Sequence, residues 1–190
     1  MKTPSMNRRP LLLMLMLALS LGGLAQPARA ALDIGDRAPD FTLMAALAGQ
    51  PFTYSLAGAL AKGPVVLYFF PLAFSEACSI EAHNFAEATP EFTALGASVV
   101  GVSTDDLATL TRFSVQACNG RFPVASDATK QVVAAFDATM QTRPDHANRI
   151  SYVIAPDGKI IHSYLSLNPT RHVERTLAAV RLWRSTTAPR

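Results

Sequence analysis

Two hydrophobic periods alternate along the chain after residue 40. Runs of β-branched and aromatic residues at 65–70 and 98–103 are typical of buried strands, and residues 149–154 alternate between apolar and polar as a half-buried strand does. Between these runs, apolar residues recur every three or four positions, as in helices that bury one face. The pattern therefore predicts strands that alternate with helices.

Turn and cap signals supply the remaining elements. The expected elements, in chain order, are short strands at 41–43 and 52–54, a helix over 56–61, the strand 65–70, a helix from Glu76, the strand 98–103, a helix from Asp105 or Asp106 to about Cys118, an extended piece at 122–126, a helix over 129–136, an irregular connection over 137–148, hairpin strands at 149–154 and 159–165, and a last helix from Asn168 with Val173, Leu177 and Val180 inward. Thr89 and Pro90 predict a kink or a restart within the helix from Glu76. This order favours one α/β domain with a thioredoxin-like fold, a central mixed β-sheet flanked by helices.

The first 30 residues follow a different pattern. Three basic residues within the first nine positions precede an apolar run at 11–24, and Ala28-Arg29-Ala30 has the form of a cleavage site. This apolar run is short for a membrane span, which needs roughly 20 residues. We expect a signal peptide at 1–30, the domain at 31–190 and a periplasmic or secreted protein. An uncleaved anchor is the alternative, and both general and twin-arginine export stay open.

Removing this segment changes the charge. It holds four of the 17 basic residues and none of the 14 acidic ones, so the rest of the chain has a formal net charge of −1 instead of +3. Nothing basic then remains to indicate a nucleic-acid partner, and mixed charge on solvated faces is the expected surface. After cleavage we expect a monomer or homodimer without stable membrane association.

One of the two cysteines lies where the strand 65–70 gives way to a helix. Pro71 ends the strand, Ser75 is a good N-cap, and Cys78 falls in the first turn. A thiol there faces unpaired backbone N–H groups and the positive end of the helix dipole, which favour the thiolate. The position suits a nucleophile. A core cysteine, or a disulfide with Cys118 in an oxidising compartment, is the alternative.

Pro71, Ser75 and Cys78 match the pattern P-x-x-x-[ST]-x-x-C, and this segment resembles the active-site loop of the peroxiredoxins. The resemblance extends over nearly the whole chain after residue 30 and is closest to the bacterioferritin-comigratory (PrxQ) branch. It implies a thiol peroxidase that reduces hydrogen peroxide or small organic hydroperoxides, with neither metal nor flavin. Cys78 would be oxidised to a sulfenic acid, and an external dithiol such as a thioredoxin-like protein would recycle the enzyme.

The resemblance also assigns roles around Cys78. Arg149, just before a strand and a D-G hairpin, would lie over the thiolate and the peroxide; by its spacing alone it would be a solvated arginine. The Ser75 hydroxyl would both cap the helix and hold the peroxide oxygen, and Pro71 would shield the thiolate from water. Arg149, Ser75 and the backbone N–H of Cys78 would stabilise the charge that builds on the two oxygens.

The second thiol departs from the PrxQ pattern. Many members of that branch have it five residues after the first, where this chain has His83 on a polar stripe that favours a solvated histidine. Some peroxiredoxins carry a resolving cysteine in the helix that here ends near Cys118, and the resemblance implies that role for it. An inert core cysteine or a permanent structural disulfide is the alternative. Glu76 is expected to point to water.

Two rival functions stay open. A thiol–disulfide oxidoreductase on the same fold would need C-x-x-C at the helix start, where this chain has Ser75 and Cys78. A copper-binding domain would need closely spaced cysteines with a placed histidine, and a structural domain would hold a disulfide that resists reduction and would not react with peroxide. The other histidines (His146, His162 and His172) and Trp183 indicate only surface and packing.

Overall fold

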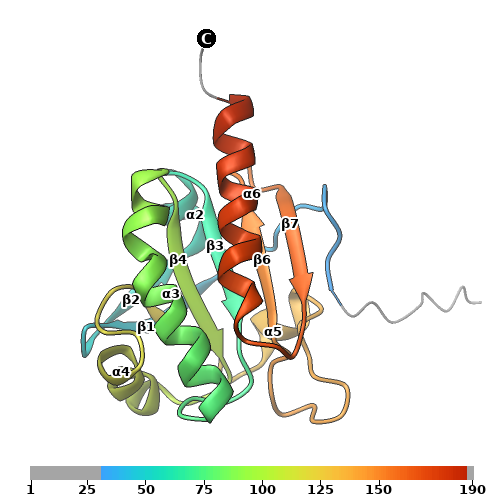
Figure 1. The fold of residues 1–190 in the computed structure, drawn as a ribbon. Coiled ribbons are helices and arrows are strands. Elements are labelled where there is room, and N and C mark those ends of the chain that lie inside the picture. The colour runs from blue at the N-terminus through green and yellow to red at the C-terminus, as the bar shows by residue number, and fades with distance from the viewer. Residues whose placement is uncertain (1–30, 188–190) are drawn as a thin grey trace, which may run out of the picture.

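The computed structural model describes residues 31–187, which form a seven-stranded mixed sheet with helices on both faces (Figure 1). The predicted signal peptide at 1–30 lies outside the described residues. The elements are β1 (Thr42–Leu47), β2 (Gln50–Ser55), α2 (Leu56–Leu60), β3 (Val65–Phe69), α3 (Glu76–Ala94), β4 (Ser98–Ser103), α4 (Leu107–Gln116), β5 (Val124–Ser126), α5 (Gln131–Ala135), β6 (Ile150–Ile154), β7 (Ile160–Leu165) and α6 (Arg171–Thr187). In this part of the chain, no helix has the length and apolar character that a membrane span requires.

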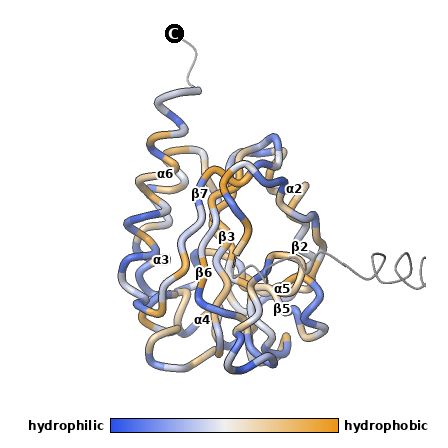
Figure 2. Tube along the Cα trace, turned by 90° about the vertical axis from the view of Figure 1, so that its right-hand side faces the viewer, coloured by the Kyte–Doolittle hydropathy of each residue, from blue (hydrophilic) through white to orange (hydrophobic). Residues whose placement is uncertain are grey.

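The sheet has the strand order β2-β1-β5-β4-β3-β6-β7. Its centre is parallel, because β4 pairs with both β3 and β5 in that sense, whereas β6, β7, β1 and β2 join through antiparallel pairs. Figure 2 shows α3, α4 and α6 on one side of the sheet and α2 and α5 on the other. Each expected strand and helix forms, with shifts of a few residues at some ends.

Strand β3 is buried along its whole length and supplies both halves of the core. Alternate residues point to opposite faces, so Leu67 and Phe69 pack with α5 and Tyr152, while Tyr68 packs under α3. The Tyr68 ring stacks on that of Phe85 with 4.5 Å between centroids. Gly101 on β4 leaves room for this ring, because a Cβ there would lie 2.8 Å from it. This dense packing holds the end of β3 and the start of α3 in place.

Helix α3 continues through Pro90, so of the expected kink or restart the restart is wrong. The hydroxyl of Thr89 donates to the carbonyl of Phe85 at 2.8 Å instead of capping a new helix. Pro90 is exposed, whereas Phe85 and Phe92 on either side of it are buried. Packing of these two rings on the sheet keeps one helix despite the missing N–H of proline.

Two helix ends differ from expectation. Helix α4 stops at Gln116, so Cys118 lies beyond it rather than in its last turn. Helix α6 begins at Arg171 rather than at Asn168, because the Asn168 side chain accepts from the Thr170 N–H at 3.0 Å and forms a turn before the helix. His172 is fully buried on the inner face of α6, together with Leu177 and Val180, so of its expected assignment to surface and packing only the packing part holds.

Candidate active site

Cys78 lies in the first turn of α3, as its position in the sequence predicts, and its side chain is only 1% exposed. The turn begins at Ser75, whose carbonyl accepts from the Ser79 N–H at 2.9 Å. The sulfur of Cys78 accepts a hydrogen bond from Nη2 of Arg149 at 3.2 Å. A buried sulfur thus meets a guanidinium in the first turn of a helix.

Ser75 occupies the N-cap position of α3, but its hydroxyl makes no capping bond to the helix. It donates instead to the carbonyl of Leu72 at 3.0 Å, so the expected side-chain cap is wrong. The donor of this hydroxyl is used within the loop, and its lone pairs remain able to accept. Pro71 follows β3, and both Pro71 and Ser75 are half-buried beside the start of the helix.

The loop between β3 and α3 is held from α4 and from the connection before it. Asp105 was expected as a possible helix cap, but Asp106 caps α4, while the Asp105 carboxylate accepts from the Ala73 N–H at 2.8 Å. Phe74 has a left-handed backbone, with φ of 64°, and its ring meets the edge of Phe113 with 5.2 Å between centroids. These contacts fix the loop that presents Cys78.

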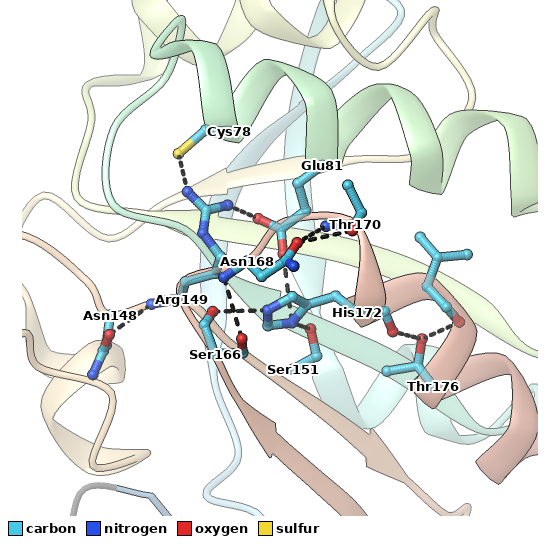
Figure 3. Close-up of polar contacts among 11 residues, drawn as sticks. Cys78, Glu81, Asn148, Arg149, Ser151, Ser166, Asn168, Thr170, His172 and Thr176 are labelled. Atoms are coloured by element: carbon cyan, nitrogen blue, oxygen red, sulfur yellow. Dashed lines mark hydrogen bonds and ion pairs between the residues drawn. The ribbon is translucent and has the colours of Figure 1, made fainter.

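Arg149 is 4% exposed, so the solvated arginine suggested by its spacing is excluded. It lies directly before β6, and its backbone N–H donates to the side chain of Asn148 at 2.9 Å. Its guanidinium donates to Cys78 through one nitrogen and to the carboxylate of Glu81 through another (Figure 3). Two fixed contacts give this cation a single orientation.

Glu81 is a site residue that the sequence analysis did not identify. It lies three residues after Cys78, so the helix brings both side chains to the same face, and it is fully buried. Burial raises the pKa of Glu81 to about 8, although the charge and hydrogen bond of Arg149 oppose the shift. A carboxylate at this spacing on an otherwise apolar helix face is the signal that could have identified it.

His172 extends the site behind Glu81. Its Nδ1 lies 2.7 Å from the Ser151 hydroxyl and 3.5 Å from Oε1 of Glu81, and its Nε2 lies 3.0 Å from the Ser166 carbonyl. Burial lowers the pKa of His172 to about 4, so the ring is neutral near pH 7. No local pattern distinguishes this histidine, because its partners lie on other elements.

His146 also contacts the active-site loop, so its assignment to surface and packing is incomplete. Its Nδ1 donates to the carbonyl of Pro71 at 3.1 Å, while Nε2 accepts from Arg143 at 2.9 Å. The irregular connection over 137–148 is therefore tied to the loop before α3. The Thr104 hydroxyl, which donates to the carbonyl of Asp145 at 2.9 Å, also holds this connection.

Cys118 is a free cysteine, as is Cys78, and it is fully buried rather than partly buried as expected. Both cysteines belong to the apolar cluster between α3, α4 and the sheet. Burial raises the pKa of Cys118, so its sulfur is a thiol in this arrangement. The structure thus holds the two cysteines in one cluster without a disulfide between them.

The other polar residues that the sequence analysis considered lie as follows. His83 and Glu76 are exposed, as predicted, and His83 approaches Asn119 at 3.5 Å. Within residues 31–187, the structure shows no group of three or more His, Cys, Asp or Glu side chains placed to hold a metal ion.

A buried cysteine at a helix start thus faces an arginine at the edge of a thioredoxin-like sheet, a geometry that suits thiol chemistry. Residues 34–163 match the AhpC/TSA family, and the chain belongs to this family of peroxiredoxins. It is 32% identical over 157 residues to the chloroplastic 2-cysteine peroxiredoxin of Chattonella marina var. antiqua, covering 77% of this chain and 80% of that protein.

Two further relatives carry names of the bacterioferritin-comigratory branch. Peroxiredoxin Bcp of Xanthomonas campestris is 26% identical over 122 residues, covering 62% of this chain and 76% of that protein. The crystal structure of peroxidoxin BcpB from Mycobacterium tuberculosis superimposes with a TM-score of 0.72 at 30% identity, covering 80% of this chain and 97% of that one. The expected family and fold class are confirmed.

Proposed function

We propose that this peroxiredoxin reduces hydrogen peroxide and small organic hydroperoxides with Cys78 as the nucleophile. The observation that supports the proposal most is the 3.2 Å hydrogen bond from Arg149 to the Cys78 sulfur, in a site where both side chains are more than nine-tenths buried. Water competes less for a charge pair in such a site than at the surface, so the cation acts more strongly on the sulfur there.

In the first step, the Cys78 thiolate attacks the terminal oxygen of the peroxide. A sulfur–oxygen bond forms with two electrons from sulfur, and the oxygen–oxygen bond breaks. The leaving hydroxide or alkoxide takes a proton from water and departs as water or an alcohol, while Cys78 becomes a sulfenic acid. Arg149 and the backbone N–H of Cys78 stabilise the negative charge that develops on the two oxygens.

Ser75 and Pro71 would complete the pocket. The Ser75 hydroxyl donates to Leu72, so its role toward a peroxide is to accept the hydrogen bond of the terminal O–H. This orients the oxygen that sulfur attacks. Pro71 has no N–H and adds no competing donor beside the thiolate. Each role follows from the hydrogen-bonding capacity that remains after the loop contacts are made.

In the second step, Cys118 would attack the sulfur of the sulfenic acid, forming a disulfide and releasing water. Cys118 is buried, and its N–H donates to the Phe113 carbonyl at 3.2 Å. A disulfide requires the two Cα atoms to lie within about 7 Å with converging Cβ vectors. We infer that the segment after α4 unwinds locally to bring Cys118 to the Cys78 sulfur. That segment ends at Gly120, whose N–H bonds the Ser114 carbonyl at 2.8 Å. A few local hydrogen bonds are lost in this opening.

The disulfide is then reduced by an external dithiol, for which a thioredoxin-like protein has the required chemistry. We further propose that residues 1–30 direct export to the periplasm or beyond and are removed after Ala30. The sequence of a basic segment, an apolar run and Ala28-Arg29-Ala30 supports this proposal. Mass analysis of the protein from an expressing bacterium, after separation of periplasm and cytoplasm, tests it: an intact N-terminus in the cytoplasm would contradict it.

The enzymatic proposal is tested by mixing reduced protein of residues 31–190 with one equivalent of hydrogen peroxide. Wild type, Cys118→Ser and Cys78→Ser are quenched rapidly and examined by mass. We expect a Cys78–Cys118 disulfide in wild type, one added oxygen in Cys118→Ser, and no rapid change in Cys78→Ser. If Cys78 reacts no faster than an ordinary free thiol, the proposal is wrong, and a non-peroxidase thioredoxin-like protein takes its place.

A further inference from the structure

His172 lies at the start of α6, with its ring between Ser166, Ser151 and Glu81 (Figure 3). The Ser166 carbonyl, 3.0 Å from Nε2, can only accept a hydrogen bond, so Nε2 carries a proton. The second ring nitrogen, Nδ1, then presents a lone pair in the neutral ring. The partners of His172 therefore fix its tautomer.

The lone pair on Nδ1 faces two groups. The Ser151 hydroxyl donates to it at 2.7 Å, and Oε1 of Glu81 lies 3.5 Å away. This oxygen is buried and has no hydrogen-bond partner among residues 31–187. An ionised carboxylate would set its lone pairs against that of Nδ1, whereas a protonated Oε1 could donate to it. The neutral ring therefore favours the protonated carboxyl of Glu81.

We propose that His172 is a positioning residue of the peroxidase reaction, which keeps Glu81 neutral so that the positive charge of Arg149 acts on Cys78. The guanidinium contacts the sulfur with one nitrogen and Oε2 of Glu81 with another. An ionised Glu81 would cancel much of that charge, whereas a neutral one leaves it for the thiolate and the transition state. The proposal rests on the proposed function in taking Cys78 as the nucleophile.

The groups around the pair are consistent with a single proton held on Glu81. Besides Arg149 and His172, the groups near Glu81 are Cys78, which shares the guanidinium, and Tyr68, whose pKa burial raises so that its phenol is neutral and adds no charge. His172 faces Arg149 and the edge of the Tyr164 ring, with 4.9 Å between centroids. Burial raises the pKa of Glu81 to about 8 and lowers that of His172 to about 4.

A pH dependence follows from this arrangement. As the pH rises through about 8, Glu81 ionises and cancels the charge of Arg149, so the reaction with peroxide slows. Without His172, the Nδ1 lone pair that opposes an ionised Oε1 is removed. Removing this unfavourable lone pair makes ionisation of Glu81 easier by about one pH unit, so the slowing sets in at lower pH.

The experiment compares the His172→Phe variant, which keeps an aromatic ring and removes the lone pair, with the protein that keeps His172. Both are made with Cys118→Ser, which isolates the first oxidation, and the second-order rate of Cys78 oxidation by hydrogen peroxide is measured between about pH 5 and about pH 9. We expect the fall in rate to move down by about one pH unit, which is a several-fold loss of rate between the two midpoints. The same substitution is also made together with Glu81→Gln, whose side chain cannot ionise. In proteins that carry Glu81→Gln, the fall in rate at high pH should be absent, so adding His172→Phe should cause no shift.

Ser151→Ala provides a test with the opposite sign and a smaller change to the core. It removes the hydroxyl that competes for the Nδ1 lone pair, so the fall in rate should move to higher pH. A downward or absent shift contradicts the proposal. The proposal is also contradicted if His172→Phe lowers the rate equally at all pH values. It is contradicted as well if His172→Phe lowers the rate as much in the Glu81→Gln protein as in the protein with Glu81, because a structural role would give either result. If Cys78 fails to react rapidly in any variant, the proposed function is wrong instead.

Discussion

The Glu81–His172 pair predicts that the protein becomes less stable between pH 6.5 and about 8. In the folded protein, the pKa of Glu81 is about 8 and that of His172 about 4, so between these values the pair holds one proton, on Glu81. In the unfolded chain, the usual pKa values are 4.5 for Glu and 6.5 for His, so one proton is held only between those two values, on His172.

The sign and size of the effect follow from this difference in bound protons. Between pH 4.5 and 6.5, both states hold one proton, and the pair contributes no slope. Above pH 6.5, the folded state keeps a proton that the unfolded state has lost, so stability falls as the pH rises until Glu81 ionises. A window of about 1.5 pH units, at about 1.4 kcal/mol each, corresponds to about 2 kcal/mol.

Urea unfolding of the reduced protein, followed by circular dichroism at several pH values between about 5 and about 8, measures this slope. Glu81→Gln is the matched control, because it keeps the shape of the side chain and removes its titration. In the control, only His172 titrates, so stability should be flat above pH 6.5 and should fall below it as the unfolded chain gains a proton. Parallel curves for wild type and control would refute the assignment of the proton to Glu81.

Three further substitutions test the site and its support. Arg149→Lys keeps a charge but replaces two separate nitrogens by one, so it cannot reproduce both contacts in their present geometry. The rate of oxidation by hydrogen peroxide should fall by about 10²-fold in a competition assay, and an unchanged rate would contradict the role of the guanidinium. Gly101→Ala places a Cβ 2.8 Å from the Tyr68 ring and should cost about 2 kcal/mol in urea unfolding, whereas a neutral effect would show that the ring moves freely. Asp105→Ala leaves the Ala73 N–H without its acceptor, so it should lower the stability by about 1 to 3 kcal/mol and slow the peroxide reaction. If both the stability and the rate stay unchanged, the loop does not depend on this hydrogen bond.

The sequence predicts the elements well where local patterns carry the information. The continuous apolar run of β3 and the cap and helical spacing after it place Cys78 in the first turn of a helix, as the structure shows. The same local signals gave a wrong restart at Pro90, because the burial of neighbouring aromatic rings outweighs the missing N–H. They also gave a wrong partner for the Ser75 hydroxyl, since a nearby loop carbonyl competes with the helix.

The polar contacts behind Cys78 depend on packing between distant elements. Arg149 meets a cysteine 71 positions earlier, and His172 meets a serine 21 positions earlier. Spacing along the chain carries no record of such contacts, so Arg149 was identified through the resemblance and His172 was missed. Glu81 is different, because a carboxylate on the inner face of the helix that holds Cys78 is visible in the sequence once that face is known.

The burial of His172 in the first turn of α6 has a practical consequence for protein engineering. The far end of this helix extends past the sheet (Figure 1), which makes the C-terminal segment attractive for exchange between related proteins. A chimera joined at Asn168 would leave the loop with Cys78, the arginine and the core strands unchanged. It would nevertheless replace the residue behind Glu81, so the exchanged enzyme should inherit the pH range of the donor of the helix rather than that of the donor of the pocket.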